Sequence, residues 1–322
     1  MKAILSEGYG PPERVLHLRD VEKPLPRESE VLLKVHAASV NIANYYMMTG
    51  VSHIMGGGII RSKDPRVGSD VAGRVEAVGE SVTRFRTGDE VFGTCLGAFA
   101  EYAVAREIRL AQKPANVSFE EVSAVPVAGL TTLQCVRDKG RVRAGQQVAM
   151  NGASGGVGTF LVQIAKSFGA KVTGVCSTRN LEQARSIGAD DVVDYSKEDF
   201  TRNGRTYDLT CDIVANRSVS DYKRALRPGG MCLIVGFARN PLVGVIKFTI
   251  LGKLGSVTGT KRIKFMGIAK INHDDLNFMG ELLAAGKIKP MIEKRYGLSE
   301  AGLALQYIGG KHTRGRVIIT IS

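Results

Sequence analysis

The stretch NGASGGVGTF, residues 151–160, constrains the fold of this chain more than any other. It follows an apolar segment that predicts a strand, and it opens a run over 156–169 that predicts a helix. A glycine-rich turn between a strand and a helix is the phosphate-binding arrangement of dinucleotide-binding βαβ units. Gly155 would let the backbone approach a pyrophosphate, and Gly158 would let the helix pack closely on the strand. The alternative is a turn without a ligand, and the flanking strand and helix favour the dinucleotide.

The predicted cofactor loop departs from the G-x-G-x-x-G pattern at its first glycine, which is replaced by alanine. Its residues are Ala153, Ser154, Gly155, Gly156, Val157 and Gly158.

Strands and helices alternate regularly around this loop. The strands are predicted at 146–152, 170–177, 190–195, 207–216 and 229–237, and the helices at 156–169, 180–188, 219–227 and 273–288. Apolar strand cores in such a βαβα order imply a parallel sheet covered on both faces. Before residue 120 the pattern differs, because short alternating strands at 30–40, 70–79, 89–93 and 99–105 indicate a partly closed β-domain. The tail over 312–322 has strand character and is expected to return to that first domain.

The end of the second predicted strand of this region indicates which dinucleotide is bound. An NAD site places an acid about 20 residues after the glycine loop, where it accepts hydrogen bonds from the ribose 2′-OH. This chain has VCSTRN there, with hydroxyls on Ser177 and Thr178 and a guanidinium on Arg179 that suits a 2′-phosphate. NADPH is therefore the predicted cofactor. The alternative is that Arg179 is a solvated residue at a helix start.

Composition narrows the partners and the compartment. The formal charge is +13, but the basic residues are spread along the chain, so a solvated basic surface is favoured and no nucleic-acid partner is expected. Five cysteines without a C-x-x-C pair indicate reduced thiols in a cytoplasmic setting, and no run reaches the roughly 18 apolar residues of a membrane span. The apolar, glycine-rich segment 240–259 is interpreted, in this order, as a mobile loop over the site, a dimer contact or a peripheral membrane patch.

Several segments together identify a family. GSDVAGRVEAVGESVTRFRTGDEVFG (68–93), GAFAEYAVA (97–105), PVAGLTTLQCV (126–136) and NGASGGVG occur in this order. The chain resembles the medium-chain dehydrogenase/reductase superfamily, in particular its zinc-free quinone oxidoreductase (zeta-crystallin-like) branch. The resemblance implies an α/β fold with a GroES-like domain over 1–120 and 289–322, a Rossmann domain over 121–288, and a homodimer.

Zinc alcohol dehydrogenases of this superfamily carry a cysteine ligand and a Gly-His-Glu where this chain has Asn41 and GSD (68–70). The lobe with four close cysteines is also missing from the sequence, so no metal is expected. What remains is hydride transfer from NADPH to a quinone or an α,β-unsaturated carbonyl, with hydrogen-bond donors stabilising the charge that appears on oxygen.

The resemblance also assigns site residues. Asn41 matches an asparagine near the nicotinamide, Tyr46 a tyrosine of some quinone-reductase active sites, and Thr131 a threonine at the cofactor. Core packing is the alternative for Tyr46, and a bond to its own helical turn is the alternative for Thr131. Asn44 and Met48 replace an acid and an arginine that the family often has, which indicates a more apolar mouth.

The resemblance implies five further cofactor-binding residues, four at the ends of predicted strands and one near the C-terminus. They are Tyr195, Asn216, Gly236, Phe237 and Arg316. Packing or surface roles are the alternative for each of them. A rival function is an NADPH-binding protein with a mainly non-catalytic role, structural or in binding RNA or a membrane surface.

Overall fold

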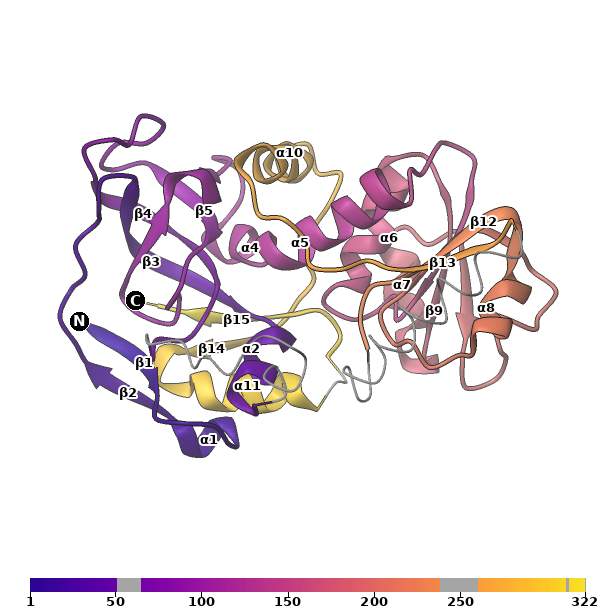
Figure 1. The fold of residues 1–322 in the computed structure, drawn as a ribbon, viewed down its shortest axis with the longest axis horizontal. Helices are drawn as coiled ribbons and strands as arrows, with labels where there is room; N and C mark the ends of the chain where they lie inside the picture. The colour runs from indigo at the N-terminus through magenta and orange to yellow at the C-terminus, as the bar shows by residue number, and fades with distance from the viewer. Residues whose placement is uncertain (51–64, 238–259, 311–312, 322) are drawn as a thin grey trace. The chain divides into compact units, whose positions relative to one another are not determined.

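The computed structural model describes residues 1–50, 65–237, 260–310 and 313–321. They form two compact units, the first joining Met1–Leu130 to Lys270–Ser322 and the second comprising Thr131–Ala269 (Figure 1). The domain boundaries at residues 120 and 288 stay predictions from the sequence pattern. The segment 240–259, interpreted above as a loop, dimer contact or membrane patch, lies outside the described residues.

The first unit is built on a seven-stranded sheet with the order β14-β15-β3-β4-β5-β7, and β6 pairs with β3. The strands are β3 (Glu30–Val40), β4 (Asp70–Val78), β5 (Glu90–Thr94), β6 (Tyr102–Arg106), β7 (Leu110–Gln112), β14 (Ile292–Gly297) and β15 (Arg316–Thr320). All pairings are antiparallel except that of β14 with β15. The four strands predicted before residue 120 are confirmed, and the C-terminal strand pairs with β3 as Val317 opposite Val40.

The remaining elements of this unit surround that sheet. They are the hairpin β1 (Lys2–Ser6) and β2 (Leu16–Asp20), and the helices α1 (Pro12–Val15), α2 (Ile42–Met48), α4 (Phe119–Ser123), α10 (His273–Ala284) and α11 (Ala301–Gly309). The chain passes from the first unit to the second within the helix α5 (Pro126–Leu133), after Leu130. Short 3-10 turns cover Glu107–Arg109 and Leu298–Glu300. α4 begins at a capping box, in which the Ser118 hydroxyl accepts a hydrogen bond from the Glu121 amide. α5 continues into a π-helical segment over Gln134–Lys139.

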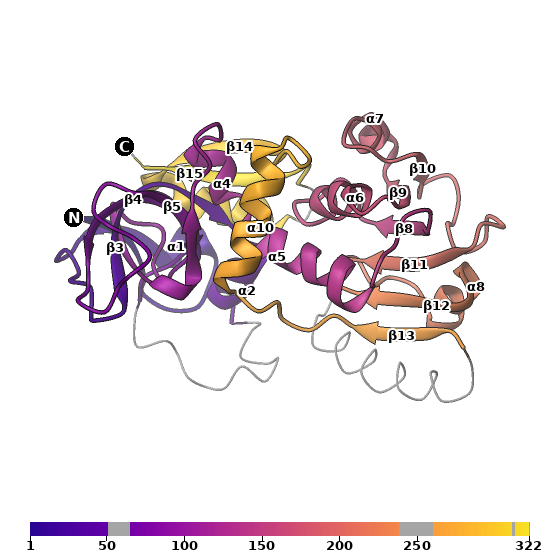
Figure 2. The ribbon, with the colours of Figure 1, turned by 90° about the horizontal axis from the view of Figure 1, so that it is seen from above.

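The second unit contains a six-stranded sheet in which every pairing is parallel. Its order is β10-β9-β8-β11-β12-β13, which Figure 2 shows as a stack seen edge-on. The strands are β8 (Gln147–Asn151), β9 (Lys171–Cys176), β10 (Asp191–Asp194), β11 (Tyr207–Asp212), β12 (Leu226–Ile234) and β13 (Arg262–Phe265). The chain runs outward from β8 in one direction and from β11 in the other, so the two strands flank a topological switch point.

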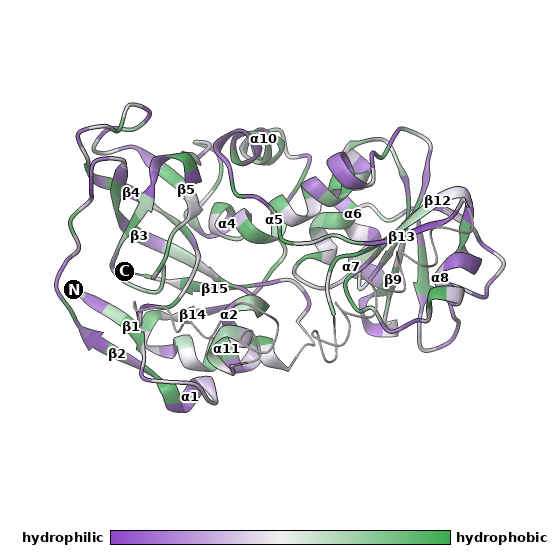
Figure 3. Cartoon of the chain, in the orientation of Figure 1, coloured by the Kyte–Doolittle hydropathy of each residue, from purple (hydrophilic) through white to green (hydrophobic). Residues whose placement is uncertain are grey.

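Helices α6 (Gly158–Ser167), α7 (Leu181–Ser186) and α8 (Val219–Ala225) pack on this sheet, and Thr178–Asn180 forms a 3-10 turn before α7. Figure 3 shows the hydrophilic residues on α8, whose Tyr222 nonetheless packs in the apolar cluster of this unit. The predicted βαβ rhythm and parallel sheet are confirmed.

Two predicted boundaries in this unit are wrong in an informative way. The strand predicted over 207–216 ends at Asp212, because its carboxylate accepts hydrogen bonds from the Val214 and Ala215 amides and turns the chain. The helix predicted to begin at residue 156 begins at Gly158, because the preceding residues form the turn of the glycine loop.

Candidate functional site

The glycine loop joins the carboxyl end of β8 to α6. Gly152 has φ +89°, in the left-handed region that favours glycine, and its amide donates to the Val175 carbonyl of β9. A Cβ on Gly158 would lie 2.0 Å from the Gly152 carbonyl oxygen, so only glycine lets α6 begin this close to the strand. A Cβ on Gly155 would meet nothing nearer than the Ile213 Cδ1 atom at 3.5 Å. A Cβ at position 155 would therefore make only ordinary van der Waals contacts with the described residues.

The amides of this loop fit a phosphate group. Gly155 donates to the Gly152 carbonyl, but Gly156, Val157 and Gly158 donate no hydrogen bond to any described residue. Such unpaired N–H groups at the start of the ten-residue helix α6 are the donors that bind a pyrophosphate in dinucleotide sites. The fit supports a dinucleotide at this loop.

Two other loop residues have structural contacts. The Ala153 side chain is fully buried, and the Ser154 hydroxyl accepts a hydrogen bond from the Asn180 side-chain amide at 2.9 Å. Asn180 also donates to the Ser177 hydroxyl at 3.1 Å. The buried Asn180, which the sequence reading missed, thus ties the glycine loop to the end of β9.

The carboxyl ends of β9 and β10 bring the predicted 2′-phosphate residues together with an acid. Thr178 and Arg179 are exposed after β9, and Tyr195 is 53% exposed after β10. The Asp194 carboxylate, at the end of β10, accepts a hydrogen bond from the Thr178 hydroxyl at 2.5 Å and others from Ser196. The hydrogen bonds from Ser196 and then Thr178 lower the pKa of Asp194. The sequence pattern does not identify this acid, because it lies on the strand after the one whose end is expected to meet the ribose.

The carboxyl ends of β11 and β12 carry the next predicted residues. Asn216 is exposed in the turn after β11, and Gly236 and Phe237 follow β12. A Cβ on Gly236 would lie 3.1 Å from the Ile213 carbonyl oxygen, so the two turns approach closely. The Phe237 ring packs at 5.5 Å from the Phe265 ring. Thr131 lies partly buried on α5.

In the first unit, Arg316 and Asn41 form a buried polar cluster with Asp70. The Arg316 Nη2 atom donates to Ser39 at 2.6 Å, to Asn41 Oδ1 at 2.9 Å and to Asp70 Oδ2 at 3.3 Å. Arg316 is 4% exposed and Asp70 is fully buried, so the guanidinium and the carboxylate form a desolvated ion pair. Three segments that are far apart in the sequence meet here, namely the starts of α2, β4 and β15.

This cluster is incompletely paired. Asp70 Oδ1 and Arg316 Nε have no hydrogen-bond partner among the described residues. Burial raises the pKa of Asp70 to about 6, against the opposing effect of the Arg316 charge. Burial also lowers the pKa of Arg316, although a guanidinium stays charged in proteins.

α2 positions the remaining predicted residues of this unit. Asn41 precedes its first turn, and the Asn41 amide donates to Asn44 Oδ1 at 3.0 Å, so the buried Asn44 caps the helix. The Asn41 side chain itself contacts Arg316 and Ser69, and its Nδ2 atom donates to the Ser69 hydroxyl at 3.3 Å. Tyr45 packs against the core of the unit, whereas Tyr46 is half-buried with its ring edge-on to Tyr45.

Among the described residues, no three His, Cys, Asp or Glu side chains come together in a group that could hold a metal ion. In the same part of the chain, no helix is long and apolar enough to cross a membrane.

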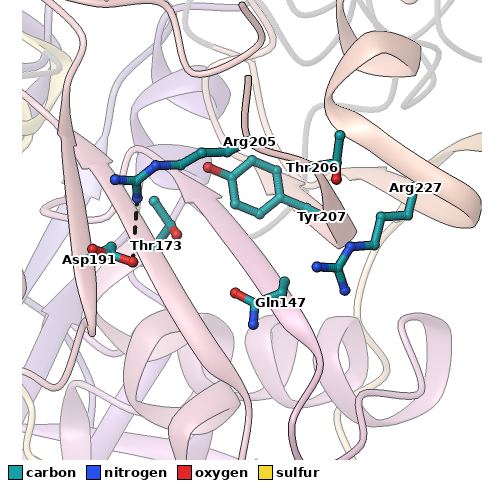
Figure 4. Close-up of a pocket in the computed structure, with 7 residues that line it drawn as sticks. All are labelled: Gln147, Thr173, Asp191, Arg205, Thr206, Tyr207 and Arg227. Atoms are coloured by element: carbon teal, nitrogen blue, oxygen red, sulfur yellow. Dashed lines mark ion pairs between the residues drawn. The ribbon is translucent and has the colours of Figure 1, made fainter. Parts of the chain in front are cut away.

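A polar pocket of about 240 Å³ lies elsewhere, at the amino ends of the strands of the second unit (Figure 4). Its lining residues are Gln147, Thr173, Asp191, Arg205, Thr206, Tyr207 and Arg227. Arg205 pairs with Asp191 at 3.4 Å and Arg227 with Asp208 at 3.1 Å, so both guanidiniums have a carboxylate beside them. Because ligands of open parallel sheets bind at the carboxyl ends of the strands, this pocket is not the candidate site.

Comparison with known proteins identifies two family matches. Residues 27–115 match the family described as alcohol dehydrogenase GroES-like domain, and residues 187–319 match the family described as zinc-binding dehydrogenase. The quinone oxidoreductase of Pseudomonas aeruginosa is 32% identical over 331 residues, which cover 99% of this chain and 99% of that protein. The chloroplastic quinone-oxidoreductase homolog of Spinacia oleracea is 31% identical over 333 residues, covering 99% and 98%.

Solved structures show the same likeness. The quinone oxidoreductase from Coxiella burnetii superposes with a TM-score of 0.85 at 28% identity, covering 100% of this chain and 99% of that one. The fold predicted from the sequence, a GroES-like domain with a Rossmann domain, is confirmed. Identity above 30% over nearly the whole length places this chain in the quinone oxidoreductase (zeta-crystallin-like) branch of the medium-chain dehydrogenase/reductase superfamily, a family of oxidoreductases.

Proposed function

We propose that this protein is a zinc-independent oxidoreductase that uses NADPH to reduce a quinone or an α,β-unsaturated carbonyl. The observation that carries the proposal is the row of unpaired amides at Gly156, Val157 and Gly158, which are suited to binding a pyrophosphate. The similarity to quinone oxidoreductases supports the acceptor class.

NADPH is preferred over NADH because of the side chains after β9. Arg179 is exposed next to the Ser177 and Thr178 hydroxyls, a set that suits a 2′-phosphate. The Asp194 carboxylate would instead suit a ribose hydroxyl, but both of its oxygens already accept hydrogen bonds from Thr178 and Ser196. Lys197 lies 3.9 Å from it and offsets its charge.

The proposed chemistry needs a hydride donor and a hydrogen-bond donor. When bound, the nicotinamide supplies a hydride, which reduces the acceptor by two electrons and leaves negative charge on its oxygen. Asn41 is proposed to donate a hydrogen bond to that oxygen from Nδ2, while Arg316 holds its Oδ1 atom. Tyr46 and Thr131 are proposed as further contacts to the acceptor and the cofactor. No metal is required for this step, because the acceptor is already electron-poor.

Loss of the reduced-nicotinamide absorbance with a panel of quinones and 2-alkenals tests the proposal. We expect turnover with NADPH, a lower kcat/KM with NADH, and no change after treatment with a chelator. Binding of NADPH without turnover of any acceptor would instead support the non-catalytic role, and RNA or anionic vesicles that compete with NADPH would identify its partner. Sizing of the pure protein tests the proposed homodimer, and fractionation of cells tests the proposed cytoplasmic location.

A further inference from the structure

The buried carboxylate of Asp212 lies at the switch point between β8 and β11. Its Oδ2 atom accepts hydrogen bonds from the Tyr222 hydroxyl at 2.7 Å and from the Asn151 side-chain amide at 2.8 Å. Its Oδ1 atom accepts from the Val214 and Ala215 amides, both at 2.7 Å. Asp212, Asn151 and Tyr222 are all at most 6% exposed, so these four hydrogen bonds are shielded from water.

The main chain of Asp212 makes a second set of contacts. Its carbonyl oxygen accepts from the Val235 amide at 2.7 Å and from the Gly236 amide at 3.3 Å. One residue therefore holds both the turn after β11 and the turn after β12. Asn216 lies in the first of these turns, and Gly236 and Phe237 lie in or after the second.

The turn after β11 also supports the glycine loop. The Ile213 side chain fills the space where a Cβ on Gly152 would stand, at 2.4 Å from that position, and it borders Gly155. The Ile213 amide donates to the Asn151 carbonyl at 3.2 Å. Displacement of this turn would therefore move the wall against which the glycine loop rests.

The turn is held in a conformation that its sequence does not favour. Ala215 has φ +53°, in the left-handed region that costs a residue with a Cβ about 1–2 kcal/mol. Such a conformation persists only where its surroundings hold it, and the Ala215 amide is one of the two that donate to Asp212. The carboxylate is the group that compensates the strain.

We propose that Asp212 is a positioning residue of the cofactor site, together with Asn151 and Tyr222. It holds the turns after β11 and β12 in the conformation that binds the dinucleotide. This inference rests on the proposed function for what the turns bind. Asp212 itself has no donor to offer a ligand, since both of its oxygens are occupied, so it acts through the backbone that it anchors.

The chemistry of the group explains why it is a carboxylate. Four donors converge on two acceptor oxygens, and an amide at this place would present its NH₂ group to two of those donors. Asp212→Asn therefore leaves two donors unpaired in a buried site, and this variant risks failing to fold. Tyr222→Phe removes one donor and keeps the carboxylate, so it is the milder variant on which the inference can be tested.

Asp208→Asn is the matched control. Asp208 also lies on β11, but near the amino end of the strand, whereas Asp212 lies at the carboxyl end. The Asp208 carboxylate accepts a hydrogen bond from the Gln147 amide at 2.7 Å and forms an ion pair with Arg227. It resembles Asp212 in anchoring a backbone amide, but it holds neither turn. Any effect common to both variants is therefore a general loss of stability.

The first measurement is hydrogen exchange of the full chain without cofactor. In Tyr222→Phe we expect the amides of 213–216 to exchange about fivefold faster than in the wild type, as loss of a hydrogen bond worth about 1 kcal/mol implies. In Asp208→Asn we expect those amides to exchange at the wild-type rate. Unchanged exchange in Tyr222→Phe, or equal acceleration in the control, would overturn the positioning role.

The second measurement is the dissociation constant of NADPH, together with kcat at saturating cofactor. We expect Tyr222→Phe to weaken NADPH by about fivefold with kcat changed by less than about twofold, and Asp208→Asn to leave both unchanged. A wild type that binds no NADPH would refute the proposed function, whereas the exchange measurement would still decide whether Asp212 holds the turns. A variant with loosened turns and wild-type affinity would refute the link to the cofactor.

Discussion

Two buried aspartates, one in each unit, show how differently a chain can treat a desolvated carboxylate. Asp212 has both oxygens filled by four donors, two from side chains and two from the backbone. Asp70 is equally buried, but one of its oxygens has no partner among the described residues. The other accepts from the Val127 amide and from the Arg316 guanidinium, which also donates to Ser39 and Asn41. A fully paired carboxylate is suited to anchoring backbone, whereas a partly paired one beside a fixed cation is suited to responding to charge.

The largest effect that distinguishes the two is expected from Arg316→Met. This change leaves the Asp70 carboxylate buried without its cation, which costs about 3–5 kcal/mol in the free energy of unfolding. It also frees the Asn41 side chain, so we expect kcat/KM to fall at the same time. Denaturant unfolding and steady-state kinetics measure the two losses separately.

The double variant Arg316→Met with Asp70→Leu is the control for that change. Replacing a whole buried ion pair by apolar residues is often neutral in stability, so we expect most of the lost free energy of unfolding to return. Activity should not return, because Asn41 still lacks the guanidinium that fixes it. Recovery of both would mean that the pair only packs the unit.

The second prediction concerns the free energy of unfolding as a function of pH, which depends on the protonation of Asp70. The folded-state pKa of Asp70 is about 6 and its ordinary value is 3.8, so the folded protein binds this proton more tightly than the unfolded chain does. The stabilising contribution is therefore fully present below about pH 3.8 and is lost as the pH rises through about 6. The loss amounts to about 3 kcal/mol, at 1.36 kcal/mol for each pKa unit.

Denaturant unfolding of the wild type and of Asp70→Asn across this range measures it. The wild type should lose stability relative to the variant as the pH rises from about 4 to 7. The activity of the wild type should show an inflection near pH 6 that is missing from the variant. Parallel stability curves would mean that Asp70 does not titrate in this range.

Removing an exposed charge is expected to have a smaller effect than changing the surroundings of a buried carboxylate. Arg179→Ala should reduce the preference for NADPH over NADH by about tenfold, as loss of a charge-assisted hydrogen bond of about 1.5 kcal/mol implies. Stability should hardly change, because the side chain is exposed. The matched control is Arg185→Ala on α7, whose side chain is 55% exposed and whose nearest carboxylate, Glu182, is 3.9 Å away. If both variants shift the preference equally, the effect is general charge rather than recognition of the 2′-phosphate.

Most of the fold could be predicted because its signals are local. The run over 30–40 predicts β3 with its bounds, and the glycine turn between two apolar runs predicts β8 and α6. β13 and β14 were missed because Arg262–Phe265 is only four residues long and Ile292–Gly297 contains charged residues at its centre. Such edge strands are defined by the neighbour they pair with, which no local pattern reveals.

The candidate site was less accessible to sequence reasoning for the same physical reason. Asn41 and Arg316 were named separately, but their hydrogen bond joins residues 275 positions apart. Asp194 and Asp212 were missed because each ends a strand as an ordinary polar residue, and only the parallel sheet brings them to its carboxyl edge. Asp194 lies one residue before the end of the strand predicted over 190–195, so the convergence of strand ends predicts its place. Asp212 lies inside the strand predicted over 207–216, so only the structure shows that it ends a strand.

The smallest expected effect tests the anchor itself. Ala215→Gly removes the Cβ from a residue with φ +53° and should stabilise the protein by about 0.5–1 kcal/mol, because the strain is relieved while the amide still donates to Asp212. Ala43→Gly, at an exposed position of α2, is the control and should destabilise by about 1 kcal/mol. If the relieved turn also binds NADPH more weakly, the strain at Ala215 contributes to the shape of the site; if affinity is unchanged, Asp212 alone maintains that shape. Denaturant unfolding and cofactor titration of the two variants separate these outcomes.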